Sequence, residues 1–195
     1  MKKIMSGVIR FLVGIFLLTI LPFVHGCASF GRSFSDGNDI KSFAVCAVEK
    51  GWRLYSQGDF NAALKRFHQA TIIDPEYAAG YFGEALIYSI QKDYDLAICG
   101  YKKTIEIDPK FAPAYSNLGR IYLHKENPVV AHQMISKAIS LAPSNGDVYV
   151  AMVIYYCYME EFDKAWDYLR KAEEKGATID GELINKLKEA SGVRD

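Results

Sequence analysis

The feature that most constrains this chain is a proline that returns at a fixed interval. Pro75, Pro109 and Pro143 are equally spaced along the chain, and each follows a stretch whose apolar residues have helical spacing. A proline lacks an amide hydrogen and restricts the residue before it, so it commonly ends a helix. A fixed period of about 34 residues indicates a repeated structural unit.

Other positions repeat in the same phase and alternate between small and large residues. Two helices approach closely only where their side chains are small, and large side chains from neighbouring turns fill the spaces beside these crossings. The pattern therefore predicts helices that cross at the small positions. The small columns are Ala63, Ala97, Ala131 and Ala165; Gly51, Ala85, Gly119 and Val153; and Ala70, Thr104, Ala138 and Ala172. The large columns are Phe67, Tyr101, Ile135 and Leu169; Leu54, Tyr88, Tyr122 and Tyr156; and Tyr81, Tyr115 and Tyr149, with Ala47 as a weak first member.

Each unit is predicted to be a helix, a short turn and a second helix. Asp59 and Asp93 follow the first helices of two units, where an aspartate side chain caps the next helix. In the third unit an Asn127-Pro128 pair places proline at the first helical position after a cap. Ser144 and Asp147 resemble a capping box at the start of the fourth unit.

The period and its columns resemble those of the tetratricopeptide repeat family over residues 44–177. The resemblance implies an all-α, right-handed α-solenoid of four helix-turn-helix units at 44–77, 78–111, 112–145 and 146–177. Residues 178–195 follow the last unit and contain a helical stretch over 178–191. Its apolar face holds Leu183, Ile184 and Leu187, so it is predicted to cap the open end of the solenoid.

Residues 1–26 have the pattern of a signal peptide. A basic start precedes an apolar run over 11–24, which is shorter than the roughly 20 residues that a transmembrane helix needs. The following Val24-His25-Gly26-Cys27 resembles the lipobox of bacterial lipoprotein precursors, although His25 departs from the small residue usual at its position. The resemblance implies a lipid anchor, including palmitate, on Cys27. The alternative is an uncleaved membrane anchor with an incidental cysteine.

A lipidated Cys27 implies a protein of the bacterial cell envelope. In a Gram-negative cell, Ala28 rather than Asp after the cysteine implies the outer membrane, on its periplasmic side. Residues 27–43 are rich in Ser, Gly and Asp and are predicted to be a flexible tether between the lipid and the array.

The charge of the chain argues against a nucleic-acid partner. Lys+Arg and Asp+Glu both number 23, and loss of residues 1–26 would leave 20 basic against 23 acidic residues. Nucleic-acid binders usually show a basic excess. Cys46, Cys99 and Cys157 have no metal-ligand spacing, so they are predicted to be buried or half-buried small residues, with a disulfide between one pair as the alternative.

The sequence contains no motif for catalysis or for a cofactor. It lacks GxSxG, GxGxxG, a Walker loop and HExxH. His68 and His132 lie in expected second helices, where solvated or capping roles are expected rather than metal ligation. We therefore predict no enzyme activity, no cofactor, no metal and no small-molecule substrate.

In the tetratricopeptide repeat family, the first helices line a concave groove, and the same register predicts the groove of this chain. Its surface is largely apolar and aromatic with a polar centre, a make-up typical of protein-binding surfaces. Most of the Lys, Asn and Arg set that forms the family's carboxylate clamp is missing. The alternative is that part of the set packs internally. The predicted groove residues are Trp52, Tyr55, Phe82, Leu86, Ile90, Asn117, Arg120, Leu123, His124, Ile154 and Tyr158.

These observations predict a scaffold or adaptor that holds a segment of another protein near the membrane. The family resemblance suggests roles such as a pilotin in pilus assembly or an organiser of cell-wall enzymes. The alternative is an accessory subunit that regulates an envelope enzyme, such as a hydrolase, without binding a peptide in the groove.

Overall fold

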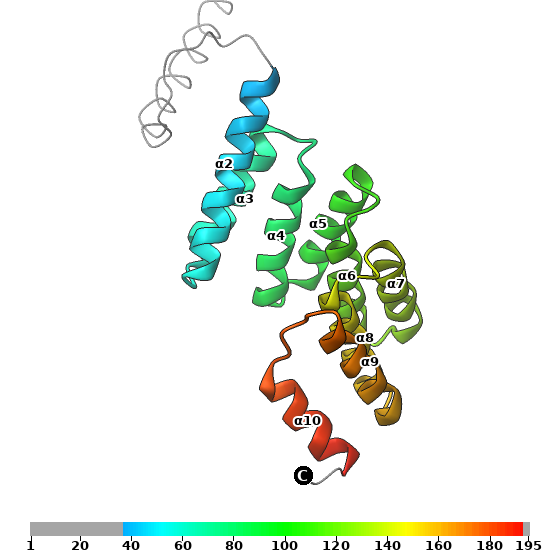
Figure 1. Cartoon of the computed structure of the whole chain (residues 1–195). Helices are drawn as coiled ribbons and strands as arrows, with labels where there is room; N and C mark the ends of the chain where they lie inside the picture. The colour runs from blue at the N-terminus through cyan, green and yellow to red at the C-terminus, as the bar shows by residue number, and fades with distance from the viewer. Residues whose placement is uncertain (1–36, 193–195) are drawn as a thin grey trace, which may run out of the picture. The chain divides into compact units, whose positions relative to one another are not determined.

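The computed structural model describes residues 37–192, and this part of the chain contains nine α-helices and no strand (Figure 1). Eight of them form four helix pairs joined by short turns, and the ninth follows the last pair. The pairs are α2 (Gly37–Ser56) with α3 (Phe60–Ile73), α4 (Ala78–Gln91) with α5 (Tyr94–Ile107), α6 (Ala112–His124) with α7 (Pro128–Leu141), and α8 (Gly146–Tyr158) with α9 (Phe162–Glu174); α10 spans Gly181–Ser191. The fold is an all-α helical repeat.

The first helix starts earlier than the composition suggested. The tether was expected to reach residue 43, but α2 begins at Gly37 and runs for 20 residues, whereas α3 to α9 have 13 or 14. Gly, Asn and Asp are frequent in linkers and also at helix N-termini, so composition alone placed the boundary too late. The predicted signal peptide, Cys27 and the first part of the tether lie outside the described residues.

The turns between helices use the predicted caps in part. The Asp59 side chain accepts a hydrogen bond from the amide of Ala62 at 3.0 Å. Asn127 caps α7 in the same way, with Pro128 in its first turn. Asp93 occupies the capping position of α5, but its side chain makes no capping hydrogen bond.

The predicted capping box at Ser144 is wrong. The cap of α8 is the next residue, Asn145, whose side chain accepts a hydrogen bond from the amide of Asp147 at 2.9 Å. Asparagine caps helices as well as serine does. The helix starts at Gly146, where a Cβ atom would lie 2.6 Å from the carbonyl oxygen of Ala172. Close packing against α9 at this glycine is consistent with the later start.

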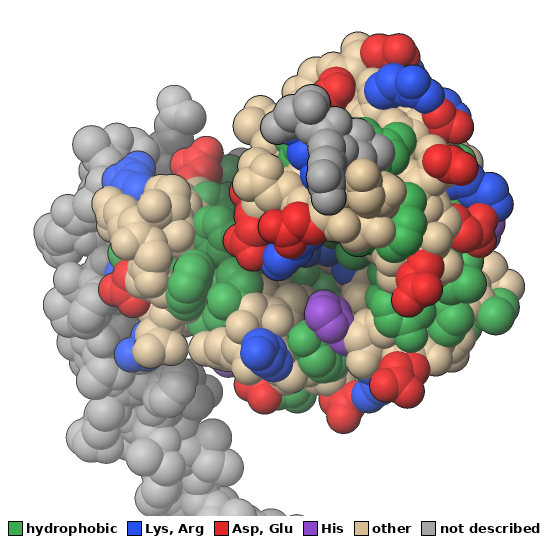
Figure 2. Space-filling model, turned by 90° about the horizontal axis from the view of Figure 1, so that it is seen from below, with side chains coloured by type: hydrophobic (Ala, Val, Ile, Leu, Met, Phe, Trp, Pro, Cys, Tyr) green, Lys and Arg blue, Asp and Glu red, His purple; other side chains and the backbone are tan. Residues whose placement is uncertain are grey.

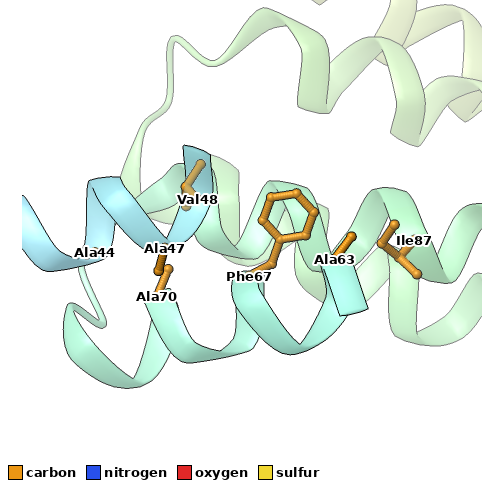
Figure 3. Close-up of a cluster of buried hydrophobic side chains, with 7 residues drawn as sticks. All are labelled: Ala44, Ala47, Val48, Ala63, Phe67, Ala70 and Ile87. Atoms are coloured by element: carbon orange, nitrogen blue, oxygen red, sulfur yellow. The ribbon is translucent and has the colours of Figure 1, made fainter. Parts of the chain in front are cut away.

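The small columns lie at the helix crossings, as predicted. Ala63, Ala97, Ala131 and Ala165 have no exposed surface. In the first unit, the ring of Phe67 fills the space between α2, α3 and α4 (Figure 3). A Cβ atom on Gly51 would lie 2.6 Å from this ring, and one on Gly83 would also collide with it. Glycine at these two positions therefore allows one large side chain to pack against two successive first helices.

Each helix packs against its neighbours along the array. Every second helix contacts the first helix of the next unit, and the first helices α2, α4, α6 and α8 contact one another in order. Within the described residues, no helix has both the length and the apolar character that a membrane span requires.

The C-terminal helix caps the array, as predicted. Leu187 is buried against Val153 and Leu169, and the half-buried Leu183 and Ile184 pack on the same cluster. The indole nitrogen of Trp166 donates a hydrogen bond to the Ser191 hydroxyl at 3.3 Å. The helix is shorter than expected because Asp180 caps it, so it begins at Gly181 rather than at residue 178.

Candidate functional site

Two rows of side chains recur with the repeat period along the first helices. Because α2, α4, α6 and α8 contact one another in order, residues in the same phase form a row across the four helices. Most members of both rows are apolar, and the polar exceptions after the first unit lie on α6. The first row is Trp52, Leu86, Arg120 and Ile154, and the second row is Ile90, His124 and Tyr158, preceded by Ser56.

The structure shows pockets where α6 meets α8. One has a volume of about 320 Å³, the other about 280 Å³, and Arg120 lines both. The face of the molecule in Figure 2 is hollowed, with hydrophobic side chains beside the hollow and basic and histidine side chains at it. Six predicted groove residues are thus brought together. The first pocket is lined by Arg120, Leu123, His124, Glu126, Ile154 and Tyr158; the second includes Asn117, Arg120, Asn145, Asp147, Val150 and Thr178.

The predicted aromatic residues on α2 and α4 form a packed wall. Trp52 contacts the rings of Phe67 and Phe82, with centroid distances of 4.9 and 6.0 Å. Phe82 also packs on Tyr101 and Phe111. The Trp52 and Phe82 side chains are half-buried, so they stabilise the array and are only partly accessible.

The other predicted residues on this side differ in exposure. Tyr55 packs on Trp52 and on Phe60, and both Tyr55 and Leu86 are half-buried. Ile90 is exposed. Neither pocket between α6 and α8 includes any of the predicted groove residues of α2 and α4.

A polar cluster lies beneath the middle of the rows. The Tyr101 side chain is fully buried, and its hydroxyl accepts a hydrogen bond from the Ser89 hydroxyl at 3.3 Å. Burial raises the pKa of Tyr101 to about 12, while hydrogen bonds with Ser89 and Asn117 and the charge of Arg120 act in the opposite direction. The Asn117 side chain therefore lies close enough to the Tyr101 hydroxyl to lower its pKa.

Arg120 is exposed and forms no ion pair among the described residues. Its guanidinium makes no ion pair or hydrogen bond with any other residue of the described part of the chain. His124 is exposed and stacks on Tyr94, with ring centroids 5.2 Å apart and planes 9° apart. Leu123 is almost fully buried, so it supplies more to the core than to the surface.

Several pocket residues were not predicted from the sequence. Asn145 and Asp147 lie at the N-terminus of α8, and Glu126 lies in the turn after α6. The repeat period could have identified the turn position of Glu126. It stands two repeat periods after Gly58 and one after Lys92, and all three residues have positive φ angles. Repetition of the turn therefore indicates that Glu126 closes α6 in the same left-handed conformation as that glycine.

The cysteines and the other histidines of the described residues line neither pocket. Cys46 and Cys157 are half-buried, as predicted, and burial raises the pKa of the Cys157 thiol. Cys99 is exposed, contrary to the prediction, because it lies on the outward face of α5. His68 contacts the Glu84 carboxylate at 2.8 Å, and His132 packs against Tyr155. No disulfide joins the three cysteines.

Comparisons with known proteins agree with this architecture. A family model described as a tetratricopeptide repeat matches residues 101–133. No curated protein matches the chain by sequence. A crystal structure of MamA is similar, with 23% identity and a TM-score of 0.56, over 68% of this chain and 77% of that one.

Two further solved structures share the fold. The Arabidopsis OM64 TPR domain has 21% identity and a TM-score of 0.57, over 61% of this chain and 98% of that one. The APC/C hetero-tetramer Cut9-Hcn1 has 16% identity and a TM-score of 0.69, over 80% of this chain but only 32% of that one. The matched segment shows a tetratricopeptide repeat within this chain, and the solved structures show that its described residues share the helical-repeat fold.

Proposed function

We propose that this chain is a non-catalytic scaffold that binds a segment of another protein along the two rows of its first helices. A lipid on Cys27 would hold it at the bacterial envelope, on the periplasmic side of the outer membrane in a Gram-negative cell. Roles in pilus assembly or in the organisation of cell-wall enzymes fit this proposal. The tetratricopeptide repeat fold, which serves protein–protein interaction, supports the binding role.

The pocket between α6 and α8 is the observation that carries the proposal. Ile154 and the 46%-exposed Tyr158 offer apolar surface beside the guanidinium of Arg120, which has no ion pair within residues 37–192. Partly exposed tyrosine and arginine are the residue types that dominate the energetics of protein interfaces. Burial of an apolar ligand side chain here would provide affinity, while Arg120 would orient the segment by charge-assisted hydrogen bonds. No bond is made or broken.

A pull-down with the full chain in detergent, followed by mass spectrometry, would identify the partner. Tyr158→Ala should then weaken partner affinity by about 2 kcal/mol, roughly thirtyfold. Tyr158 is a better probe than Phe82, because Phe82 packs against Phe111 and Tyr101 and its removal would also destabilise the fold. The matched control is Lys137→Ala, which changes an exposed side chain of α7 that lines neither pocket.

The control variant should bind the partner as the unchanged chain does, and circular dichroism should show the same helix content in all variants. Normal binding by Tyr158→Ala would contradict the groove proposal. If variants on the second helices or on α10 lost binding instead, the chain would act as an accessory subunit through its other face.

A further inference from the structure

We infer that the bound segment carries one internal acidic side chain flanked on both sides by apolar side chains, with the acidic group paired to Arg120. This inference rests on the proposed groove function and adds the chemistry of the partner. It follows from the order of residues along the rows. It also follows from the exposure of the Arg120 guanidinium, which has no ion pair with any described residue.

The first row is apolar except at one position, Arg120. Leu86 on α4 and Ile154 on α8 stand on either side of Arg120, and all three occupy the same phase of the repeat. The second row repeats this order, with Ile90 and Tyr158 on either side of His124. A segment that crosses α4, α6 and α8 therefore meets apolar, then basic, then apolar surface.

The charge of Arg120 requires a partner once the groove is covered. In the free protein, water solvates the exposed guanidinium, since it has no ion pair with any described residue. A ligand that covered it with apolar atoms would leave a desolvated, unpaired charge, which is strongly unfavourable. A carboxylate satisfies the guanidinium, often through two parallel hydrogen bonds.

The neighbouring acidic residues do not neutralise Arg120. Glu126 lines one pocket and Asp147 lines the other, but both are exposed and neither forms an ion pair with the guanidinium. The basic neighbour His124 is stacked on Tyr94. The position that attracts an acidic group along the first row is therefore Arg120 itself.

The apolar surface on both sides of Arg120 favours an internal acidic residue over a chain end. A C-terminal carboxylate at Arg120 would leave either the α4 side or the α8 side uncovered. Packed helices lie about 8–10 Å apart, and an extended chain rises about 3.3 Å per residue. Successive row positions then correspond to about three ligand residues, so the expected pattern is apolar, two residues, acidic, two residues, apolar.

A displayed library of random twelve-residue peptides tests the inference on the full chain in detergent. The unchanged chain should enrich peptides with one acidic residue between two apolar ones. Arg120→Glu should enrich a basic residue at the same position. Lys137→Glu introduces the same charge change on an exposed part of α7 and should select the same peptides as the unchanged chain.

An enriched peptide then serves as a synthetic probe. Replacement of its acidic residue by the matching amide should lower affinity about tenfold or more for the unchanged chain, but have little effect for Arg120→Met. Amidation of the peptide C-terminus should have no effect. If amidation abolishes binding, or if Arg120→Glu selects the same peptides as the unchanged chain, the inference is wrong while groove binding stands. If no peptide binds in a way that depends on Tyr158, groove binding itself fails.

Discussion

The four alanines at positions 63, 97, 131 and 165 have no exposed surface because each lies where two helices cross. At Ala131 the crossing is especially close, since a Cβ atom on Gly119 would lie 3.0 Å from the Ala131 carbonyl oxygen. Protein interiors are packed as densely as organic crystals, so such a position has no room for a larger side chain. Residue size at these points therefore determines how closely α6 and α7 approach.

Ala131→Leu should destabilise the protein by about 1–3 kcal/mol, because the added carbons overpack the α6–α7 crossing. Chemical denaturation monitored by circular dichroism would measure the change. Gln133→Leu adds a leucine to the same helix at an exposed position and should change the free energy of unfolding by no more than about 0.5 kcal/mol. Equal stability of the two variants would show that the assigned phase is wrong.

Tyr101 should make the free energy of unfolding fall as the pH rises above 10. Its pKa in the folded chain is about 12, against 10.0 for the free side chain, because burial disfavours the phenolate. The folded state therefore holds this proton more tightly, so the contribution to stability is complete below pH 10 and is lost as the pH rises towards 12. By linkage the loss amounts to about 3 kcal/mol.

Denaturation of the unchanged chain and of Tyr101→Phe between pH 9 and about pH 12 would test this. Tyr77 and Tyr156 also have raised pKa values, through burial first, so both proteins should lose some stability. The unchanged chain should lose more, and the difference between the two should shrink as the pH rises. A constant difference would contradict the assignment to Tyr101.

Helix α10 stands in the phase of a fifth first helix. Leu187 follows Val153 by one repeat period, and Leu183 follows Tyr149 by the same interval. The earlier members of the Leu187 column are Gly51, Ala85, Gly119 and Val153, the first three of which are small. In the described part of the chain no second helix follows α10, so a large residue at this position meets no crossing and instead fills the end of the core.

Leu187→Ala should open a cavity at this end and cost about 2–5 kcal/mol locally. Hydrogen exchange should become faster in α9 and α10 and remain unchanged in α2 and α3, which have no contact with this cluster. Glu189→Ala, an exposed change on the same helix, should leave exchange unaltered. Uniformly faster exchange along the whole array would show that the ends are more strongly coupled than the contacts suggest.

The features of this fold that could be predicted from the sequence are those that the repeat period determines. The crossings at Ala63 and Ala131 and the buried ring of Phe67 follow from phase alone, since identical spacing places residues at equivalent contacts. The start of α2 and the cap at Asn145 could not be predicted in this way. They depend on competition between neighbouring polar residues for one capping position, which the repeat period does not resolve.

For the candidate site too, the sequence predicted part of the arrangement and not the rest. Phase identified the helix face that carries Arg120, Ile154 and Tyr158, and these residues do meet at one pocket. It did not reveal that Phe82 packs into the wall or that Asn117 lies beside Tyr101, because those contacts depend on the side chains of second helices. The pairing state of Arg120 likewise required the structure.

At the scale of the whole molecule, contacts between units are made chiefly by adjacent helices, so the array is a chain of local interfaces. The proposed lipid on Cys27 would add one attachment point to this array, and the first described helix begins a short distance along the chain, at Gly37. A short connection of this kind would keep any bound segment close to the membrane surface.

Cys27→Ser should abolish lipid attachment, because the thiol is the proposed acylation site. Metabolic labelling with a palmitate analogue should mark the unchanged chain and not the variant, and membrane fractionation should place only the unchanged chain in the outer membrane of a Gram-negative host. Cys46→Ser, a change within α2, is the matched control and should retain the label. Label on the Cys27→Ser variant would contradict the lipoprotein proposal.

The two tryptophans of the chain lie at opposite ends of the array. Trp52 packs against Phe67 and Phe82 in the first unit, whereas Trp166 lies in the last pair and reaches Ser191 on α10. Indole emission depends on the immediate surroundings of the ring. Each end therefore carries its own optical reporter, and a chain in which one tryptophan is replaced by phenylalanine will show whether the two ends of the solenoid melt together or in sequence.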